Sequence, residues 1–416
     1  MTAAQLSVQF FIQMAVIIAA CRIVGWLAQR YLGQPQVVGE MIAGVLLGPS
    51  VFGLFAPGLQ AALFPAESKS VLFVGAQLGV GLYMFIVGLG FDREELAGSA
   101  RSAALISVSG MIVPFAAAAL LVPWLLNVDG LFGERVNAVQ AALFLGAAIA
   151  ITAFPMLARI IHERGLSGTP LGTLSLSAGA IGDAGAWGVI ALLLASLGDG
   201  PSVAILALGG GTAFAFMMIF LAPKWLAPLG RIAEREGGVS QGVLAIVLVL
   251  FLLSAFLMDG IGIHAVFGGF LLGTAMPRGR FAEALIEKLE PFALTFLLPM
   301  FFTYSGLNTQ LLMVNNASLI VVTLAILVAS IVAKGGACYV AARLAGQDHR
   351  TSMGIGALMN ARGLMELIII NIGLQRGIIE PALYAILVVM AIVTTLMASP
   401  LFEMVCGNYS RKRPAS

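Results

Sequence analysis

The chain has 416 residues, of which 60% are hydrophobic and only 10% are charged, with a formal net charge of +2. Ordinary soluble domains are about 25% charged, and so few charges could not cover this much apolar surface in water. The composition excludes a water-soluble enzyme, a disordered chain and a secreted disulfide scaffold, and it leaves a membrane protein with many spans. The net charge is too small to indicate nucleic-acid binding. The three cysteines, Cys21, Cys338 and Cys406, are too far apart for a metal or disulfide motif.

Apolar segments long enough to cross a bilayer follow one another along the chain. A spanning helix needs about 20 apolar residues. We therefore predict an all-α membrane protein with thirteen transmembrane helices, at about residues 7–29, 36–53, 70–91, 102–126, 137–161, 172–197, 202–223, 239–258, 262–276, 291–308, 316–343, 352–374 and 380–402. The first span is followed by too many others to be a cleaved signal peptide.

Positive charges between the spans predict the orientation. Lys and Arg gather in the loops on the cytoplasmic side of a membrane. If the N-terminus lies outside, nearly all Lys and Arg in the connections are cytoplasmic, and only Lys69, Arg135 and Arg376 lie outside. We therefore expect an integral protein of the bacterial inner membrane, with its N-terminus outside and its C-terminus in the cytoplasm.

One carboxylate lies in the middle of a predicted span. Asp183 belongs to the sixth span, and its neighbours Gly179, Gly182 and Gly185 are small. A charge at this depth is costly and indicates a function by default, and small neighbours leave room for an ion and its waters. A buried carboxyl group can hold either a proton or a cation. The structural alternative is an aspartate paired with Lys334 or bonded to the backbone.

Three further charges lie within predicted spans. Lys334 is in the eleventh span, whereas Arg362 and Glu366 are four residues apart in the twelfth and therefore share one helix face. Lys334 could pair with a carboxylate, line the site, or extend to the cytoplasmic interface. Arg362 and Glu366 could form a local ion pair. We expect all three residues to compensate charge inside the membrane.

Two spans contain residues that interrupt a helix. The interrupting residues of the fifth and twelfth spans are Thr152, Ala153, Phe154, Pro155, Asn360, Ala361 and Gly363. Nonhelical backbone at membrane depth is tolerated where it is buried in protein or lines a cavity. Because the breaks are seven spans apart, residues 1–198 and 239–402 form two halves of opposite direction, joined by a linker helix at 202–223. Such an inverted repeat is typical of secondary transporters, whose site lies at the broken helices.

Other kinds of membrane protein fit less well. An intramembrane aspartyl protease needs a second mid-membrane aspartate, and an intramembrane metalloprotease needs a His-Glu-x-x-His motif; the sequence has neither. No glycine-rich phosphate-binding loop precedes a lysine, so ATP-driven pumping is not expected. We therefore expect a transporter rather than an enzyme, without a cofactor, driven by an ion gradient or by the gradient of its solute.

Seven stretches in order along the chain resemble the monovalent cation:proton antiporters, in particular the second cation:proton antiporter family. They are residues 34–50, residues 152–159, Asp183 with Ala186 and Trp187, residues 262–265, residues 298–306, Lys334 with Gly335, and residues 360–367. The fold of that family has a dimerisation domain beside a core domain in which two broken helices cross. The resemblance implies a homodimer whose core consists of spans four to six and eleven to thirteen.

The resemblance also implies roles for single residues. Asp183 matches the essential carboxylate of the sixth span and Lys334 the basic residue of the eleventh, and Thr152 would help Asp183 to bind the cation. Relatives usually carry an acidic or amide residue where this chain has Gly182. Lys334 therefore lacks its usual partner, and we expect Glu366 or water in that place. A single carboxylate leads to the hypothesis of one proton per cation, hence electroneutral exchange.

Together these implications predict a secondary active transporter that exchanges Na⁺ or K⁺ for H⁺ by alternating access. We expect one transmembrane unit over residues 1–416, with a short cytoplasmic tail at 403–416 and no soluble regulatory domain. Two alternatives on the same fold stay open: a gated K⁺ efflux system that resembles a channel, and a symporter that carries an organic anion with Na⁺ or H⁺. The sequence does not decide among Na⁺, K⁺ and Li⁺, because carbonyl geometry sets that preference.

Overall fold

The computed structural model describes residues 2–91, 93–194, 202, 205–308, 316–362 and 364–407. Within these ranges every regular element is a helix, and an isolated β-bridge joins Phe132 to Ile379. The predicted all-helical class is therefore confirmed.

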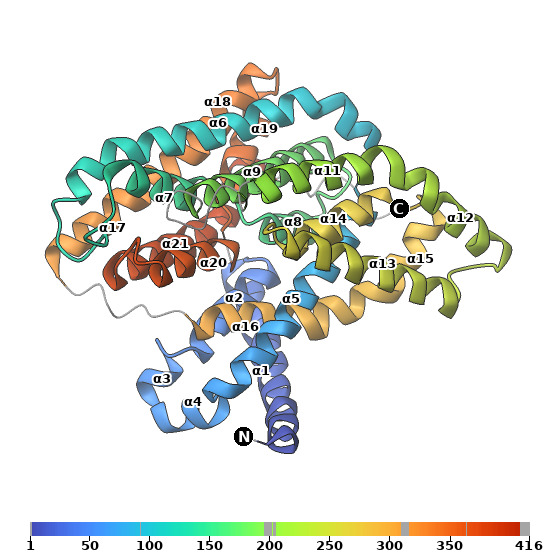
Figure 1. Ribbon diagram of the computed structural model, residues 1–416, viewed down its shortest axis with the longest axis horizontal. Coiled ribbons are helices and arrows are strands. Elements are labelled where there is room, and N and C mark those ends of the chain that lie inside the picture. Colours follow the sequence, from blue (N-terminus) through green and yellow to red (C-terminus); the bar gives the residue numbers. More distant parts are fainter. Residues whose placement is uncertain are drawn as a thin grey trace. The chain divides into compact units, whose positions relative to one another are not determined.

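The helices follow one another along the chain (Figure 1). The first group is α1 (Ala3–Leu32), α2 (Gln36–Leu47), α3 (Phe52–Phe55), α4 (Pro57–Leu63), α5 (Ala66–Leu89), α6 (Arg93–Leu125), α7 (Ala138–Ala150), α8 (Phe154–Glu163) and α9 (Pro170–Leu194). The second group is η2 (Leu206–Gly210), α11 (Gly211–Phe216), η3 (Met217–Leu221), α12 (Ala222–Arg235), α13 (Gln241–Gly260), α14 (Ala265–Ala275), α15 (Arg280–Phe292), η4 (Ala293–Leu297), α16 (Leu298–Leu307), α17 (Ala317–Ser330), η5 (Ile331–Gly336), α18 (Ala337–Leu344), α19 (His349–Leu358), α20 (Leu364–Gln375) and α21 (Pro381–Cys406). The elements labelled η are π-helical turns within longer helical runs.

Many of these helices suit a bilayer. Among the described residues, eight helical segments are long and apolar enough to cross a membrane, and α7 and α14 are shorter apolar helices. Large apolar side chains such as Phe11, Leu120 and Phe256 are exposed on them. Exposed apolar helices are stable in lipid because they satisfy their own backbone hydrogen bonds. The chain is therefore an integral membrane protein, whereas the thirteen spans and the orientation stay predictions.

Hydropathy located the long apolar helices but missed amphipathic ones. The helical run that was predicted to end near residue 223 continues to the end of α12, and α15 lies in what was predicted as a connection. α15 buries Phe281, Leu285 and Leu289 on one side and carries charged residues such as Glu283 and Lys288 elsewhere. Charges on one helix face lower the mean hydropathy of a segment without preventing helix formation.

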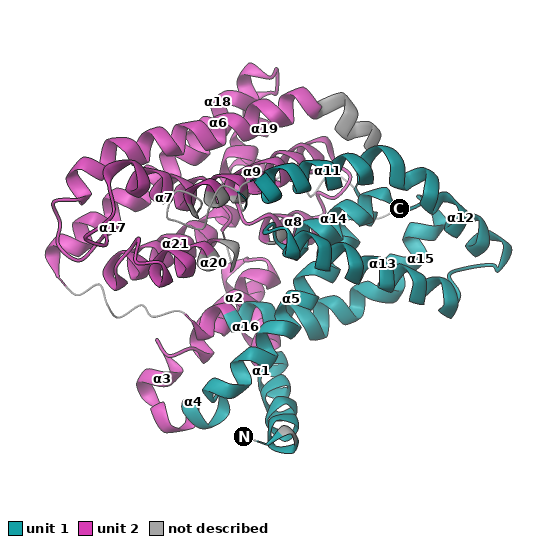
Figure 2. Ribbon diagram, viewed as in Figure 1, with its two compact units in different colours: residues 1–19, 61–93, 194–304 teal, residues 20–60, 94–193, 305–416 magenta. Residues whose placement is uncertain are grey.

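The chain divides into two compact units (Figure 2). Unit 1 comprises residues 1–19, 61–93 and 194–304. Within it α5 and α14 pack closely through glycines: a Cβ atom on Gly88 would lie 2.3 Å from the carbonyl oxygen of Phe270, and one on Gly273 would lie 2.2 Å from that of Phe85. Only small residues allow two helix backbones to approach this closely.

Unit 2 comprises residues 20–60, 94–193 and 305–416. It therefore includes the six spans that the family resemblance assigns to the core, together with residues 20–60. A Cβ atom on Gly356 of α19 would lie 2.8 Å from the carbonyl oxygen of Gly335 in η5, so these two segments are in backbone contact. The division into a core and a dimerisation domain, and the inverted repeat, stay predictions.

Candidate functional site

The first helix break follows α7. Asn137 begins this helix with a capping box, in which its side chain accepts a hydrogen bond from the amide of Gln140 and the side chain of Gln140 accepts one from the amide of Asn137. The helix ends at Ala150, because Ile151 has extended backbone angles (φ −66°, ψ 134°). The last carbonyl groups of α7 therefore lack helical partners and carry partial negative charge.

The interruption is shorter than the sequence predicted. Thr152 and Ala153 are nonhelical, but Phe154 and Pro155 belong to the start of α8. A proline is tolerated in the first turn of a helix, where its missing N–H group would have no helical partner. Pro155 therefore belongs to the first turn of the second half-helix and does not extend the break.

The second break follows α19. Asp348 caps the start of this helix by accepting hydrogen bonds from two backbone amides of the first turn. After α19 the chain leaves the helix at Asn360 and Ala361, both of which are buried. The side-chain amide of Asn360 donates a hydrogen bond to the carbonyl oxygen of Gly356 (3.0 Å). Gly363, the last predicted break residue, lies outside the described residues.

The two breaks hydrogen-bond to one another although they are about 200 residues apart in sequence. The amide of Ala153 donates to the carbonyl oxygen of Ala361 (3.0 Å), and the hydroxyl group of Thr152 donates to that of Met359 (2.9 Å). Both bonds satisfy polar groups that the interrupted helices leave without partners. Unit 2 thus brings the two predicted breaks together.

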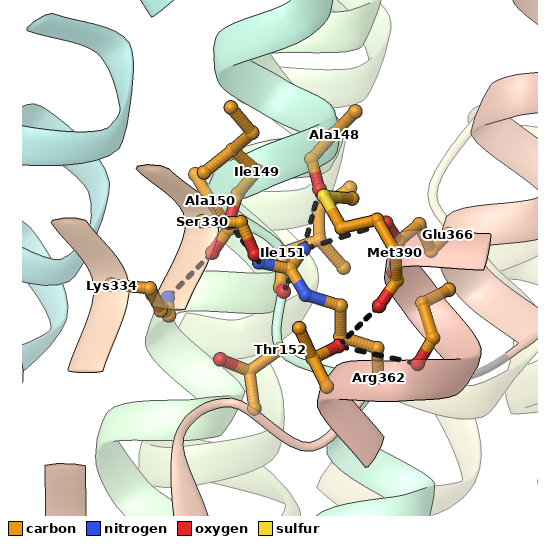
Figure 3. A network of polar contacts seen from close by, with 12 residues as sticks. Ala148, Ile149, Ala150, Ile151, Thr152, Ser330, Lys334, Arg362, Glu366 and Met390 are labelled. Atoms are coloured by element: carbon orange, nitrogen blue, oxygen red, sulfur yellow. Dashed lines mark hydrogen bonds and ion pairs between the residues drawn. The ribbon is translucent and has the colours of Figure 1, made fainter. Parts of the chain in front are cut away.

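Arg362 binds the end of α7 (Figure 3). Its guanidinium group is fully buried and donates hydrogen bonds to Ala148 O (2.6 Å), Ile149 O (2.7 Å), Ile151 O (3.3 Å) and Ser330 Oγ (3.1 Å). A planar donor with five N–H groups suits several converging oxygens. The arginine of one broken helix therefore neutralises the partial negative charge at the C-terminus of the other.

Glu366 completes this contact. Its Oε1 atom lies 3.5 Å from Nη1 of Arg362, and both side chains are inaccessible to solvent. The local ion pair that the spacing of four residues allowed is therefore present in the structure. The second oxygen, Oε2, forms no hydrogen bond within the part of the chain that the structure describes.

Lys334 reaches the same helix end from another element. Its ammonium group is buried and donates a hydrogen bond to the carbonyl oxygen of Ala150 (2.5 Å; Figure 3). It donates a second one to the carbonyl oxygen of Gly110 on α6 (3.0 Å). It lies in the π-helical turn η5, a local widening of the helix that is frequent at functional sites. Lys334 therefore does not extend to the interface. Carbonyl oxygens, rather than Glu366, meet its charge.

Asp183 is the buried carboxylate without a hydrogen-bond partner. It lies in the middle of α9 with 0% of its surface exposed, and neither of its oxygens forms a hydrogen bond with any described residue. Small neighbours explain the burial: a Cβ atom on Gly179 would lie 2.8 Å from the side chain of Leu157, and one on Gly185 would lie 2.7 Å from that of Met111. Neither of the structural alternatives, a bond to Lys334 or to the backbone, is seen among these residues.

The chemistry of the site follows from these contacts. Lys334 and Arg362 are held by backbone carbonyl oxygens, so that their charges are fixed in place and compensated. Asp183 has no hydrogen bond among the described residues and interacts with Lys334 only electrostatically, and an ionised carboxylate without a hydrogen-bond donor is costly in an apolar interior. Of these charged groups, Asp183 is therefore the one that no hydrogen bond within the described residues holds in place.

Sequence reasoning missed the partners of the two basic residues. The predicted break already leaves carbonyl groups among residues 148–151 without helical donors, and Pro114 removes the helical donor of the Gly110 carbonyl four residues earlier. The sequence does not show which side chains bind these oxygens, because both basic residues are far away along the chain. Ser330 gave a weak signal, because it is a polar residue four positions before Lys334 in an otherwise apolar span.

Within the described residues the buried carboxylate of Asp183 has no hydrogen bond, and it lies in the same unit as the two helix breaks and as Lys334 and Arg362, whose side chains bind carbonyl oxygens. Such an arrangement defines an ion-coupled membrane transporter. The chain belongs to the family described as "Sodium/hydrogen exchanger, transmembrane", which matches residues 10–406. The predicted resemblance to monovalent cation:proton antiporters is therefore confirmed. Its assignment to the second of these families stays a prediction.

Individual relatives agree with this family. The Na(+)/H(+) antiporter NhaS4 of Synechocystis is 39% identical over 93% of this chain and 94% of that protein. The Na(+)/H(+)-K(+) antiporter GerN of Bacillus cereus is 28% identical over 98% of this chain and 99% of that protein. K(+)/H(+) antiporter 1 of Saccharomyces cerevisiae is 30% identical over 95% of this chain, which spans 46% of that protein. Similarly, the chain spans about half the length of several Arabidopsis thaliana relatives.

The fold is also found among solved structures. The sodium proton antiporter MjNhaP1 from Methanocaldococcus jannaschii matches with a TM-score of 0.64 over 97% of this chain and 99% of that chain, at 14% sequence identity. At this identity the likeness concerns the fold alone.

Proposed function

We propose that the protein exchanges a monovalent cation, Na⁺ or K⁺, for H⁺ across the membrane, and that Asp183 holds the two ions by turns. The observation that supports this proposal is that both oxygens of the buried Asp183 carboxylate lack a hydrogen-bond donor among the described residues. A proton or a metal cation would each remove the cost of this charge. The names of the relatives support both Na⁺ and K⁺ as substrates.

The free-energy cost of an empty, ionised Asp183 couples the flux of the cation to the flux of protons. In the proposed alternating-access cycle the core moves against the dimerisation domain and carries Asp183 between the two sides. Asp183 crosses with either a proton or a cation bound, because an empty, ionised carboxylate is disfavoured in a medium of low dielectric constant. Each crossing with a cation is therefore balanced by a return with a proton.

Neighbouring groups have supporting roles in this cycle. The hydroxyl group of Thr152 donates its proton to the carbonyl oxygen of Met359, so the lone pairs of its oxygen stay available for a cation. Carbonyl oxygens at the breaks provide further neutral ligands. Lys334 and Arg362 compensate the helix ends, and Glu366 balances Arg362. Their charges stay constant through the cycle, so that Asp183 alone changes its occupant.

With one exchanging carboxylate, the proposed stoichiometry is one proton per cation. Such exchange is electroneutral, and its rate at clamped ion gradients is independent of membrane potential. A response of the rate to an imposed potential, set with a potassium ionophore and measured with Na⁺ as the transported ion, would contradict this stoichiometry.

We further propose a homodimer in the bacterial inner membrane, with the N-terminus outside. The distribution of Lys and Arg and the family resemblance support this arrangement. Labelling of single cysteines in intact cells with a membrane-impermeant reagent tests the orientation, and crosslinking in the membrane tests the dimer.

Purified protein in liposomes that contain a pH dye tests the function. Addition of Na⁺, K⁺ or Li⁺ outside should move protons through the wild type, and Asp183→Asn should abolish this movement without changing the melting temperature. Asp129→Asn is the matched control, because Asp129 is exposed in the connection after α6. Exchange by Asp183→Asn would refute the site. Single-channel currents would favour the channel alternative, and uptake of an organic anion would favour the symporter.

A further inference from the structure

A buried hydroxyl oxygen that has no hydrogen bond among the described residues lies against the glycine that directly precedes Asp183 in α9. Ser107 on α6 has 0% of its surface exposed, and its hydroxyl oxygen forms no hydrogen bond with any described residue. A serine in a helix readily donates to the carbonyl group four residues earlier. Ser177 does so with Thr173 O (2.6 Å), and Thr394 does so with Met390 O (2.8 Å). Ser107 is an exception that needs a physical reason.

The position of this hydroxyl group is set by Gly182. A Cβ atom built on Gly182 would lie 3.2 Å from Oγ of Ser107, so the hydroxyl group stands beside the place of the side chain that residue 182 lacks. Met111, one turn further along α6, lies in the same way against Gly185. α6 therefore runs along α9 on both sides of Asp183 in sequence, and Ser107 faces the residue that directly precedes the carboxylate.

The same face of α6 contacts the buried lysine. Gly110 is three residues from Ser107 and therefore lies on the same side of the helix. Its carbonyl oxygen accepts the hydrogen bond from Lys334. This side of α6 thus carries two oxygens: the carbonyl oxygen of Gly110, which is bound to Lys334, and Oγ of Ser107, which has no hydrogen bond among the described residues.

We propose that Ser107 is a further ligand of the transported cation: its neutral hydroxyl oxygen coordinates the cation that Asp183 binds. This inference rests on the proposed exchange function and extends it to a residue of a third helix. Hard cations prefer oxygen ligands, and a hydroxyl oxygen can coordinate a cation through a lone pair while its O–H bond points away from the cation. The absence of a side chain at Gly182 gives the hydroxyl group its space.

A purely structural serine makes the opposite prediction. If Ser107 only fills space, then its replacement by alanine removes a buried hydroxyl group without a partner and leaves transport unchanged. If Ser107 is a ligand, Ser107→Ala weakens cation binding although the protein is as stable as before or more stable. The affinity for the cation therefore separates the two roles, whereas the melting temperature does not.

The experiment measures proton movement in liposomes as a function of Na⁺, K⁺ and Li⁺ concentration. Ser107→Ala should raise the half-saturating concentration of the preferred cation about threefold to tenfold, as expected for the loss of one ligand, with the maximal rate within about twofold. Ser177→Ala is the control, since it removes a buried hydroxyl group whose hydrogen bond is internal to α9. An unchanged half-saturating concentration in Ser107→Ala would overturn the proposal.

Gly182→Ala is a second variant that tests the role of Ser107 in the same assay. Its methyl group would lie 3.2 Å from Oγ of Ser107 and push the hydroxyl group by a few tenths of an ångström, so it should also raise the half-saturating concentration. In a Ser107→Ala background it should have little further effect, because the crowded atom is gone. Additive effects would overturn the proposal. Loss of exchange in Asp183→Asn with unchanged affinity in Ser107→Ala would leave the proposed function standing and refute the role of Ser107 alone.

Discussion

Arg362→Ala should strongly destabilise the protein. In the structure this guanidinium group donates to three carbonyl oxygens at the end of α7 and to Ser330, and it pairs with Glu366. Alanine would leave the carbonyl groups without donors and Glu366 as a buried carboxylate without its cation. Because the protein interior excludes water, no solvent would replace these contacts.

The magnitude follows from the contacts. A hydrogen bond to a charged group contributes about 1.5–3 kcal/mol, but bonds to one side chain are not additive. Removing one partner of a buried ion pair costs about 3–5 kcal/mol, and this is the loss that we expect for Arg362→Ala. Glu366→Gln in the Arg362→Ala background should recover about 0.5–3 kcal/mol, because it removes the unpaired charge.

Thermal unfolding of the purified protein in mild detergent measures this loss. We expect the melting temperature of Arg362→Ala to fall by roughly 3–6 °C, which is this loss divided by the unfolding entropy of a chain of 416 residues. Arg231→Ala is the control, because Arg231 is exposed on α12 and its truncation should change the free energy of unfolding by less than about 0.5 kcal/mol. If Arg362→Ala melts at the same temperature as Arg231→Ala, the bonds to the end of α7 do not stabilise the fold and the reasoning is wrong.

Two further predictions concern stability. Gly335→Ala would place its methyl group 2.5 Å from Nδ2 of Asn360, so its melting temperature should fall. Gly336→Ala is the control and should have a far smaller effect, because its methyl group would have nothing within 4 Å. Equal effects of the two variants would contradict the packing of η5 against α19. Hydrogen bonds from the side chain and amide of Thr351 lower the pKa of Asp348, so its cap stabilises α19 above the ordinary pKa of an aspartate and is lost as the pH falls through the lowered value. Asp348→Ala should therefore melt about 1–3 °C below the wild type at pH 7, and this difference should shrink below about pH 3.9; a constant difference would exclude the cap as its cause.

The helix breaks and the buried charges could be predicted because they violate the rules of an apolar span. Pro155 and Asn360 interrupt a hydrophobic segment, and Asp183 is a charge without a neighbouring charge in sequence. Such exceptions can be recognised in the amino-acid sequence alone. The predicted break was nevertheless too long at its C-terminal end, because Pro155 begins a helix as readily as it ends one.

Contacts between distant segments could not be predicted. The sequence indicates carbonyl groups without helical donors at the end of α7 and at Gly110, but it does not show that Lys334 and Arg362 bind them. The π-helical turn that carries Lys334 has no signature in the composition. The resemblance led to the expectation of a replacement partner for Lys334, and the structure supplies two carbonyl oxygens. No sequence pattern places Ser107 against Gly182, because this contact joins two helices that are far apart along the chain.

The dependence of cation affinity on pH tests the shared seat most directly. If one carboxylate binds the proton and the cation by turns, protons compete with the cation. The half-saturating cation concentration of the wild type should then increase as the pH falls, by up to about tenfold for each pH unit. The maximal rate at saturating cation should change much less. If the half-saturating concentration instead stays constant as the pH falls and only the maximal rate changes, the proton and the cation bind at separate groups. That result would contradict the central role of Asp183.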